Sequence, residues 1–551
     1  MNLDQALAEH IKQAFKANFE ADVKDISLQP TKKDFAGSHT FVTFPYSKIS
    51  RKKPEETAQI LGEYLKKESE FVKDFNVVKG FLNLEIEDRS WMQAFRSIQH
   101  EADFGDLAPQ ESRVMVEFSS PNTNKPLHLG HLRNNFLGDA ISRILGANGY
   151  KVFKTNLVND RGIHICKSMV AYLRHGQEES PESSGIKGDH LVGKYYVLFD
   201  KDLKKESAEL SHKILNEGED PSTLGFEGED LVKVKALRAK LKEADLDEKK
   251  KKEVEDALKK LVQNQTSALK EAKEMLQRWE SGDAETVALW KIMNGWVYQG
   301  FDKTYRKIGI AFDRIYYESN TYLLGKDVID EGLEKKLFYQ EEDGSVWIDL
   351  SQEKLDKKLL LRSDGTSVYM TQDLGTAELK FKDFKIDKSI YVVGNEQDYH
   401  FKVLFSILDK MGRSYAPGLY HLSYGMVDLP TGKMKSREGT VVDADDLVRQ
   451  MIDIARERTN ALGKTEGFSE EELQKLYEII ALGALKYFLL KVDPKKRMLF
   501  NPEESVDFEG DAAPFIQYNF ARISSLLQRA KSMEINYLED DFSAYPALKD
   551  S

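Results

Sequence analysis

The sequence contains a single cysteine, Cys166, among its 551 residues. One thiol can form neither an internal disulfide nor a zinc site built on several cysteines, so both kinds of site are excluded. Long apolar runs are also missing: no segment approaches the ~20 apolar residues that a membrane-spanning helix needs. The first residues have no apolar core of signal-peptide type. These absences predict a cytoplasmic protein with no membrane partner.

Positive charge is in the minority. Lysine and arginine together number 80 against 92 acidic residues, which gives a formal net charge of −12. Taken alone, this balance argues against a nucleic-acid partner, because phosphate binding needs positive charge. Net charge excludes little for so long a chain, because a protein that is acidic overall can still have a local basic surface. The length itself exceeds one hydrophobic core and predicts three or four domains.

The first 110 residues alternate between strand-like and helical pieces. The segments FVTFPYS (41–47) and GFLNLEIED (80–88) are predicted to be strands, and PEETAQILGEYLKKESE (54–70) is predicted to be a helix. Residues 1–110 are therefore expected to form a small α/β domain.

From Arg113 the pattern becomes that of a parallel sheet. The short apolar run VMVEFSS (114–120) ends in turn residues, and GHLRNNFLGDAISRILGANGY (130–150) follows with apolar residues at helical spacing. Asn148-Gly149 closes this helix, and KVFKTNLV (151–158) is a second strand. This strand–loop–helix–strand unit begins a Rossmann-like nucleotide-binding domain, expected over residues 111–445.

Two further regions are expected to be helical. Residues from about 175 to 295 are rich in lysine with interleaved acidic residues, which predicts solvated helices in an insertion rather than a basic face for RNA. The sheet pattern returns in DKSIYVVGN (387–395), and after residue 445 nearly every segment is helical. The fold class is thus α/β, with a small amino-terminal α/β domain, a helical insertion and an all-α carboxyl-terminal domain over 446–551.

His128, Gly130 and His131 stand at the mouth of the helix predicted to begin near residue 130. A helix amino terminus offers unpaired N–H groups and the positive end of a dipole to a phosphate. Glycine allows a close approach to the backbone, and two imidazoles can donate to phosphate oxygens. By itself, this pattern is explained equally well by two surface histidines at a helix start.

A second motif lies far downstream, in the lysine-rich glycine loop GKMKSREG (432–439) with Lys433 and Lys435. A loop that carries cations can close on a triphosphate and stabilise the leaving pyrophosphate. Alone, such a loop is more often a solvated turn. Together, the two motifs resemble the paired signatures of class I aminoacyl-tRNA synthetases.

The resemblance narrows to one family, the arginyl-tRNA synthetases. VEFSSPNTNKPLHLGHLRNNFLGDA is similar to the family signature, and four later blocks follow in the family's order: SVYMTQDLGTA, YVVGNEQDYH, SYGMVDLPTGKMKSREG and DAAPFIQYNFARISSLLQRA. The resemblance spans nearly the whole chain. It implies activation of L-arginine by ATP to arginyl-adenylate and transfer to the 3′ end of tRNA(Arg). It further implies Mg²⁺ accompanying ATP, no resident metal site and a monomer.

The resemblance also assigns residues for the two small substrates. The arginine-binding positions are Glu117, Ser120, Asn122, His131, Tyr369, Asp373 and Gln397, and the ATP-binding positions are His128, Gly130, His131, Met426, Val427 and Lys433. The chemistry agrees, because a guanidinium is a planar fork of donors that carboxylates and amide oxygens read best. Each of these residues, taken alone, would more often be an ordinary polar residue at a strand end or helix surface.

The signature loop departs from the class pattern. The class has a catalytic lysine followed by serine at the end of the motif, whereas here Lys435 precedes Ser436-Arg437 and alters the register. In this family a lysine just before the histidine motif is thought to compensate, and Lys125 occupies that place. The expected catalytic set is therefore Lys125, His128, His131, Lys433 and Lys435.

Contacts with tRNA are expected in both terminal domains. Phe81 and Asn83 align loosely with contact residues of the family's amino-terminal domain, where a ring and an amide can read bases; a buried strand phenylalanine explains Phe81 equally well. Gln517, Tyr518 and Arg522 are the expected contacts in the helical domain. The family closes with a full anticodon-binding bundle, whereas this sequence ends at FSAYPALKDS, so we expect an incomplete bundle and weakened anticodon reading.

Two other functions are considered. One is a nucleotidyltransferase or synthetase that makes a different adenylate, against which Tyr369, Asp373 and Gln397 argue; a panel of amino acids would decide. The other is a synthetase-like RNA-binding or regulatory protein. The intact His128, His131 and Lys433 argue against it, because a site without activity has no reason to keep them.

Overall fold

The computed structural model describes residues 3–100, 104–241, 247–428, 442–463, 467–501, 504 and 512–535. The chain divides into two compact units, one of residues 1–106 together with 522–551 and the other of residues 107–521. The three-domain division, with boundaries near residues 110 and 445, stays a prediction.

The first unit contains the expected small α/β domain. Helices α1 (Leu3–Phe19) and α3 (Pro54–Glu68) bury the apolar side chains Leu7, Ile11, Leu61 and Leu65. The antiparallel sheet has the order β1-β2-β4-β3, formed by Leu28–Pro30, His39–Val42, Phe81–Ile86 and Val72–Val78. A 3₁₀ turn (Phe44–Tyr46), α2 (Ser47–Ser50) and α4 (Asp88–His100) complete it.

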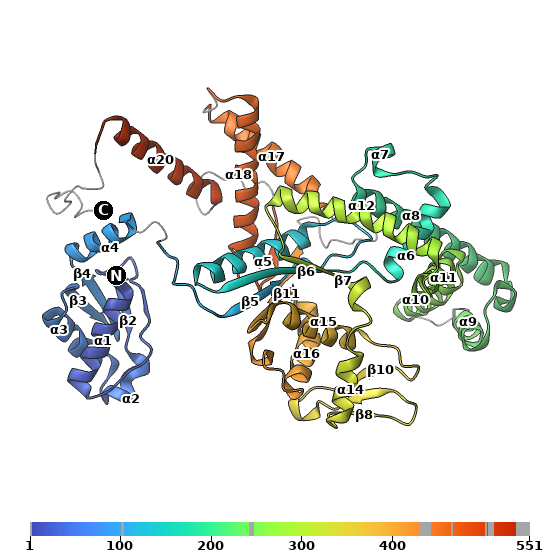
Figure 1. Ribbon diagram of the computed structural model, residues 1–551, viewed down its shortest axis with the longest axis horizontal. Coiled ribbons are helices and arrows are strands. Elements are labelled where there is room, and N and C mark those ends of the chain that lie inside the picture. The colour runs from blue at the N-terminus through green and yellow to red at the C-terminus, as the bar shows by residue number, and fades with distance from the viewer. Residues whose placement is uncertain are drawn as a thin grey trace. The chain divides into compact units, whose positions relative to one another are not determined.

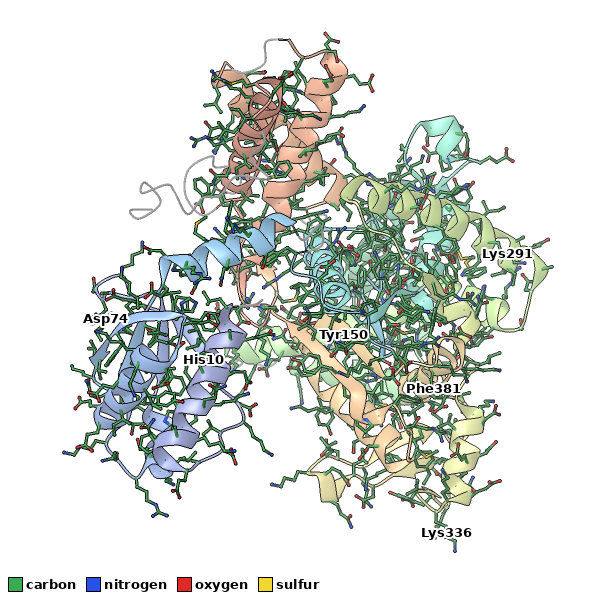
Figure 2. All side chains as sticks on the ribbon, turned by 60° about the vertical axis from the view of Figure 1, so that its left-hand side comes forward. His10, Asp74, Tyr150, Lys291, Lys336 and Phe381 are labelled. Carbon is green, nitrogen blue, oxygen red and sulfur yellow. The ribbon has the colours of Figure 1, made fainter. Side chains whose placement is uncertain are left out.

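Two details of this unit differ from or add to the prediction. The strand expected over 41–47 ends at Val42, because Pro45 lacks the N–H group that a sheet ladder requires. His10 on α1 lies 2.9 Å from the Ser69 hydroxyl, and Asp74 on β3 pairs with Lys66. Figure 2 labels His10 and Asp74 within this unit.

The second unit is built on five parallel strands in the order β12-β11-β5-β6-β7. Their bounds are Leu419–Tyr424, Lys388–Gly394, Arg113–Glu117, Lys151–Val158 and Arg314–Tyr317. The chain runs from β5 to β6 and β7 on one side and later returns to β11 on the other. The carboxyl ends of β5 and β11 therefore flank a topological switch point, where open parallel sheets bind ligands. The predicted Rossmann-like sheet is confirmed.

Helices cover both faces of this sheet (Figure 1). On one face, Val114, Val116 and Val392 join a core with α5 (Leu129–Ala147), α17 (Ala444–Ala461) and α18 (Glu470–Leu490). On the other face, Tyr391 joins a core with α14 (Lys326–Glu334), α15 (Tyr369–Phe384) and α16 (Asp398–Lys410). Burial on both faces explains why these strands read as continuous apolar runs.

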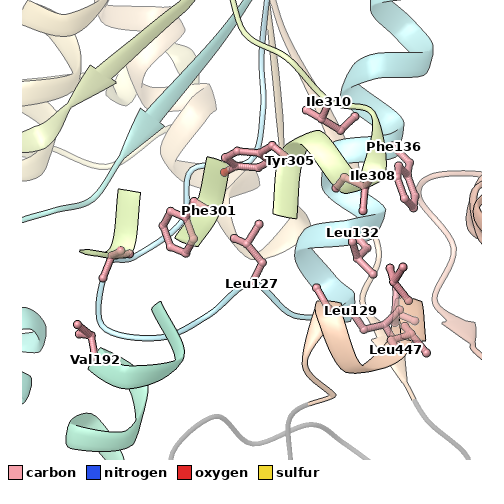
Figure 3. Close-up of a cluster of buried hydrophobic side chains, with 14 of the residues drawn as sticks. Leu127, Leu129, Leu132, Phe136, Val192, Phe301, Tyr305, Ile308, Ile310 and Leu447 are labelled. Atoms are coloured by element: carbon pink, nitrogen blue, oxygen red, sulfur yellow. The ribbon is translucent and has the colours of Figure 1, made fainter. Parts of the chain in front are cut away.

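The chain between β6 and β7 is helical, as expected for the insertion, but several of its helices are buried rather than solvated. Its members are α6 (Ile163–His175), α7 (Pro181–Ser184), α8 (Gly188–His212), α9 (Gly228–Lys240), α10 (Glu248–Gln265), α11 (Ser267–Glu280) and α12 (Ala284–Ile308). Val192 of α8 and Phe301 of α12 pack in the same core as Leu132 of α5 (Figure 3). Among the described residues, α9 and α10 form a separate small cluster of Val234, Leu258 and Val262 with Ile214 and Phe226.

The remaining elements lie after β7 in the sequence. After α13 (Glu318–Thr321) comes an antiparallel sheet that the sequence did not predict, with the order β10-β9-β8 and the bounds Lys358–Leu361, Val346–Ile348 and Phe338–Gln340. β13 (Val427–Asp428) pairs in parallel with β14 (Met498–Leu499), and α20 spans Ala513–Ser532. Among the residues that the structure describes, no helix has the length and apolar character needed to cross a membrane.

Candidate active site

The two histidines cap the amino terminus of α5, close to the carboxyl end of β5. His128 is the N-cap residue, and its Nδ1 accepts a hydrogen bond from the Gly130 N–H at 3.1 Å. Nδ1 of His131 accepts the His128 N–H, also at 3.1 Å. A neutral imidazole that accepts through Nδ1 carries its proton on Nε2. Both rings are thus fixed as Nε2–H tautomers, with centroids 3.9 Å apart.

Both histidines are neutral near pH 7. Burial, with a smaller contribution from the Lys125 charge, lowers the pKa of His128 to about 3. Burial, His128 and Lys125 lower the pKa of His131 well below its usual value. Because the two imidazoles are neutral, they can lie at the positive end of the helix dipole and donate hydrogen bonds to a phosphate without needing a counter-ion. Gly130 leaves room for this ring, because a Cβ on it would lie 3.0 Å from Cε1 of His128 and would press against it.

The segment that follows β5 is held in an unusual backbone conformation. Ser119 and Ser120 have φ angles of 80° and 43°, a region that costs non-glycine residues on the order of 1–3 kcal/mol each. The Asn134 Oδ1 accepts the Ser119 N–H at 2.5 Å, and the Asn156 Oδ1 accepts the Ser120 N–H at 3.0 Å. Backbone strain that neighbouring side chains hold in place is typical of functional sites, and Asn122, two residues further on, is exposed.

Glu117, the last residue of β5, is buried and ion-paired with Lys380 of α15. Although burial acts to lower it, the pKa of Lys380 is raised, mainly by Glu117. The ammonium also lies 5.0 Å from the centroid of the Tyr391 ring. The carboxylate that we expected to receive a guanidinium therefore already has a cation, and its role in arginine binding stays a prediction.

Asp373 is the more accessible carboxylate at this edge. It lies on the first turns of α15, its side chain is 34% exposed, and its Oδ2 is 2.6 Å from Nε2 of His400 on α16. Asp373 is also near enough to raise the pKa of Lys380, so the two predicted carboxylates flank one lysine. Tyr369 begins α15 and is 76% exposed, and Gln397, just after β11, is exposed as well.

A third carboxylate, Glu318, was missed by the sequence analysis. It follows β7 directly, and burial raises its pKa to about 7, opposed by Arg161 and reinforced by Asp160 and Asp373. The signal that could have found it is positional, since Glu318 comes directly after a strand of the parallel sheet and Glu117 is the last residue of another.

Arg133 was also missed, although it lies next to the histidine motif. Its side chain is fully buried on α5 and donates to main-chain carbonyl oxygens rather than to a carboxylate. Nη1 donates to Gly425 at 2.8 Å, and Nη2 to Pro494 and Lys496 at 3.2 and 3.1 Å, with a longer contact to Asp493 at 3.4 Å. Gly425 precedes the predicted adenine-binding pair, of which Met426 is 41% exposed and Val427 is buried.

The chain downstream of the lysine-rich loop is joined to the histidine motif. Leu129 N–H donates to Val442 at 3.1 Å, Ala444 N–H donates to Leu127 at 2.9 Å, and His128 and Asp443 form an antiparallel bridge. Lys433 and Lys435 lie outside the described residues. Lys125 lies in the segment between β5 and α5, and a cavity of about 220 Å³ is lined by Lys125, His128, His190, Lys194, Tyr196 and Asp443.

The predicted tRNA contacts fall into two groups. Asn83 is buried, and its amide is bonded to Thr40 and Asn76 within the sheet, while the half-buried Phe81 packs edge-on against the exposed Phe44. On α20, Gln517 donates to the Ile479 carbonyl oxygen at 3.0 Å, and Tyr518 and Arg522 are exposed. These assignments stay predictions.

Comparisons with known proteins agree on one family. The profile described as "tRNA synthetases class I (R), catalytic domain" matches residues 96–217 and 231–501, and "Arginyl tRNA synthetase N terminal domain" matches residues 1–86. The arginine–tRNA ligase of Amoebophilus asiaticus is 54% identical over 539 residues, covering 98% of this chain and 83% of the relative. That of Bacteroides thetaiotaomicron is 53% identical over 534 residues, covering 96% and 82%.

A solved structure agrees in fold. Thermus thermophilus arginyl-tRNA synthetase superposes with a TM-score of 0.70 at 22% identity, covering 96% of this chain and 82% of that one. This chain has a histidine-capped helix at the switch point of a parallel sheet, and the two ligases above are 54% and 53% identical to it over nearly its whole length. The chain therefore belongs to the arginyl-tRNA synthetase family of class I aminoacyl-tRNA synthetases.

Proposed function

We propose that this arginine–tRNA ligase binds ATP at the amino terminus of α5 and L-arginine beside it, between the carboxyl ends of β5 and β11 and the start of α15. Family membership makes the overall reaction ATP-dependent activation of arginine and its transfer to tRNA(Arg). The observation that carries the placement is the pair of neutral Nε2–H histidines fixed at the helix start.

In the first step the arginine carboxylate attacks the α-phosphorus of ATP in line, and pyrophosphate leaves. His128 and His131 donate their Nε2 protons as hydrogen bonds to the phosphate oxygens on which charge develops, and the α5 dipole adds to this stabilisation. Lys125, Lys433 and Lys435 supply cations to the departing phosphates. ATP enters as its magnesium complex, in which the ion is held by phosphate oxygens and water. No protein nucleophile is needed.

Arginine is recognised by its guanidinium. Asp373 is the carboxylate that accepts the guanidinium. The charge of Glu117 is already neutralised by Lys380, and its side chain is more buried than that of Asp373. Tyr369, at the start of α15, and Gln397, just after β11, are exposed, and Ser120 and Asn122 offer polar groups from the strained segment after β5. A site that pairs a carboxylate with a planar fork rejects citrulline, which leaves the charge unpaired, and fits lysine poorly.

In the second step a hydroxyl of the terminal ribose of tRNA(Arg) attacks the carbonyl carbon of the adenylate, and AMP leaves. Phe81, Asn83, Gln517, Tyr518 and Arg522 are the proposed RNA contacts. We further propose that the chain works as a monomer in the cytoplasm; its single, buried cysteine is compatible with that reducing compartment.

The test of this function is exchange of labelled pyrophosphate into ATP, with and without arginine and tRNA(Arg). We expect exchange that requires arginine and that citrulline and lysine do not support. Exchange with another amino acid, or none with a preparation that binds ATP, would contradict the proposal.

Asp373→Asn is expected to lower kcat/KM for arginine in this assay by about ten- to a hundredfold, because a hydrogen bond to a charged group contributes roughly 1.5–3 kcal/mol. The KM for ATP should stay at its wild-type value. Asp383→Asn is a matched control on the same helix, since Asp383 bonds to the Tyr316 hydroxyl instead. A loss in Asp373→Asn that is shared equally between arginine and ATP would show that the carboxylate is structural.

A further inference from the structure

Helix α8 of the insertion packs directly against the segment that leads into the histidine motif. At Gly193 a Cβ would lie 2.9 Å from Cδ of Pro126 and 3.6 Å from Cα of Lys125, so only glycine permits this approach. The helix amino terminus also carries Lys187, Asp189 and His190, three charged or titratable side chains close together in sequence.

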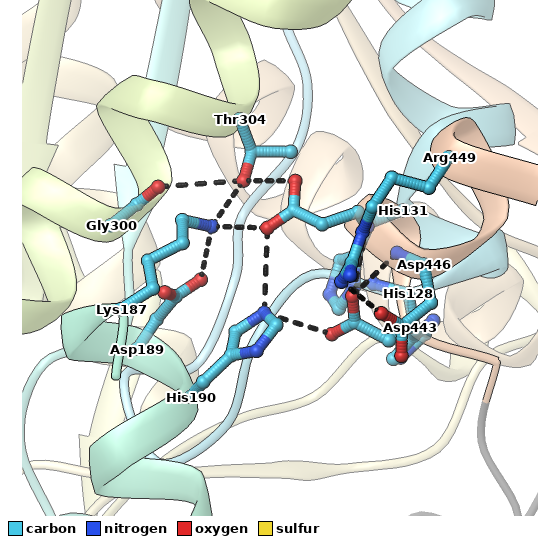
Figure 4. A network of polar contacts seen from close by, with 11 residues as sticks. His128, His131, Lys187, Asp189, His190, Gly300, Thr304, Asp443, Asp446 and Arg449 are labelled. Carbon is cyan, nitrogen blue, oxygen red and sulfur yellow. Dashed lines mark hydrogen bonds and ion pairs between the residues drawn. The ribbon is translucent and has the colours of Figure 1, made fainter. Parts of the chain in front are cut away.

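These side chains join a polar network with Asp445 and with Asp443, whose backbone forms a bridge to His128 (Figure 4). Lys187 Nζ donates to Asp445 Oδ2 at 2.6 Å, to Asp189 Oδ2 at 3.0 Å and to the Thr304 hydroxyl at 2.6 Å. His190 Nε2 lies 3.2 Å from Asp443 Oδ2 and 3.4 Å from Asp445 Oδ2. The Thr304 hydroxyl lies 3.1 Å from Asp445 Oδ1 and so links α12 to the same carboxylate.

Ion pairs between two cations, Lys187 and His190, and three carboxylates hold this network together. The carboxylates of Asp443 and Asp445, with which His190 forms ion pairs, raise the pKa of this imidazole to about 10, so it is cationic at neutral pH. Bonds from His190 and Lys187 outweigh burial and lower the pKa of Asp445. Asp189, His190 and Asp445 could in principle hold a metal ion, but the Lys187 ammonium already bridges the two carboxylates. Gly300 of α12 leaves room for this arrangement, since a Cβ there would lie 2.3 Å from Oδ1 of Asp189.

We propose that Lys187 and His190 are positioning residues for His128, acting through Asp443 and Asp445. The two aspartates are fixed to α8 by their side chains. Asp443 is at the same time the N-cap of α17, where its Oδ1 accepts the N–H groups of Asp445 and Asp446 at 2.8 and 3.1 Å. Its backbone, with those of Val442 and Ala444, pairs with residues 127–129. The insertion thereby sets where the histidine ring stands.

This inference rests on the proposed binding of ATP by His128. The test compares Lys187→Met with wild type in arginine-dependent pyrophosphate exchange, in the presence of tRNA(Arg). We expect kcat/KM for ATP to fall by about tenfold, because a small misplacement of a catalytic group lowers rate steeply, while the KM for arginine is unchanged. Lys187→Arg, which keeps a cation between the two carboxylates, should restore part of the loss. Lys201→Met, on an exposed position of α8, is the matched control.

A second readout separates positioning from stability. In histidine-labelled protein, the ¹³Cε1 signals of His128 and His131 should move in Lys187→Met, although neither residue was replaced. If Lys187→Met does not fold, Thr304→Val removes one hydroxyl from the network without changing any charge, and the same shifts are expected. Unmoved signals, or a raised KM for arginine, would overturn the proposal. A wild-type chain without arginine-dependent exchange would instead reject the proposed function.

Discussion

Replacing His128 by asparagine should lower kcat/KM for ATP in pyrophosphate exchange by about a hundredfold to a thousandfold, the usual effect of removing one donor to developing negative charge. The substitution separates the two tasks of this residue. Its Nδ1 caps α5 by accepting the Gly130 N–H, and its Nε2–H is the proposed phosphate donor. Asparagine is a good N-cap because its side-chain oxygen can accept the same bond, but it places no donor where Nε2 stands.

The matched variant is His128→Ala, which removes both the cap and the donor. It should lose the same activity as His128→Asn and, in addition, about 1 kcal/mol of the free energy of unfolding, measured by urea denaturation. Wild-type kcat/KM for ATP in His128→Asn would show that the ring acts only as a cap.

The free energy of unfolding of wild type and of His128→Asn should depend differently on pH. The pKa of His128 in the folded chain, about 3, lies below its ordinary value of 6.5, so the unfolded chain binds more protons between these values. The free energy of unfolding therefore falls as pH falls through this window, and this loss is absent above it. His128→Asn should lose less stability than wild type between neutral pH and pH ~4.5, because it lacks this contribution.

Arg133→Met should lower the free energy of unfolding of the second unit by about 3–5 kcal/mol, because it leaves several buried carbonyl oxygens without a donor and each costs roughly 1–3 kcal/mol. The guanidinium is fully buried, and its partners are the carbonyl oxygens of Gly425, Pro494 and Lys496, with Asp493 more distant. Methionine fills much of the volume but leaves these oxygens unsatisfied. Because Gly425 precedes Met426 and Val427, affinity for ATP should fall as well.

Tryptophan fluorescence is a suitable probe, since four of the five tryptophans lie in the second unit and Trp91 can be replaced by phenylalanine. Arg143→Met is the control: it makes the same substitution on the same helix, where a 71% exposed arginine pairs with Asp139 and contributes about 0–1 kcal/mol. Equal denaturation midpoints for the two variants would contradict the assigned role of Arg133.

Local pattern was enough to predict the elements that carry the site. The helix expected from residue 130 and the strand expected over 151–158 are α5 and β6, because their apolar spacing and the Asn148-Gly149 ending depend only on neighbouring residues. The insertion was described less well. The high charge content of the insertion sums the exposed and the buried faces of its helices. It therefore did not indicate that one face of α8, with Val192 and Phe199, is buried.

The partners of the site residues could not be predicted, because they come from distant segments. Lys380 lies 263 positions from Glu117, and nothing in either local pattern indicates that the two side chains meet inside the protein. Asn83 reads as a polar residue in an exposed strand position, yet Thr40 and Asn76 satisfy its amide in the interior. Pairing of Asp443 with His128 likewise depends on the closed fold.

The contacts of Arg133 also fix when the nucleotide site can form during synthesis. The carbonyl oxygens that satisfy the guanidinium belong to residues 292 to 363 positions further along the chain. At a ribosome speed of ~5–20 residues per second, the last of them is made roughly 20–70 s after Arg133. Throughout that interval the nascent chain already contains both histidines but lacks the complete set of acceptors for the Arg133 guanidinium. A ribosome that stops before residue 496 therefore releases a chain with the histidine motif but without the complete support of the proposed ATP site.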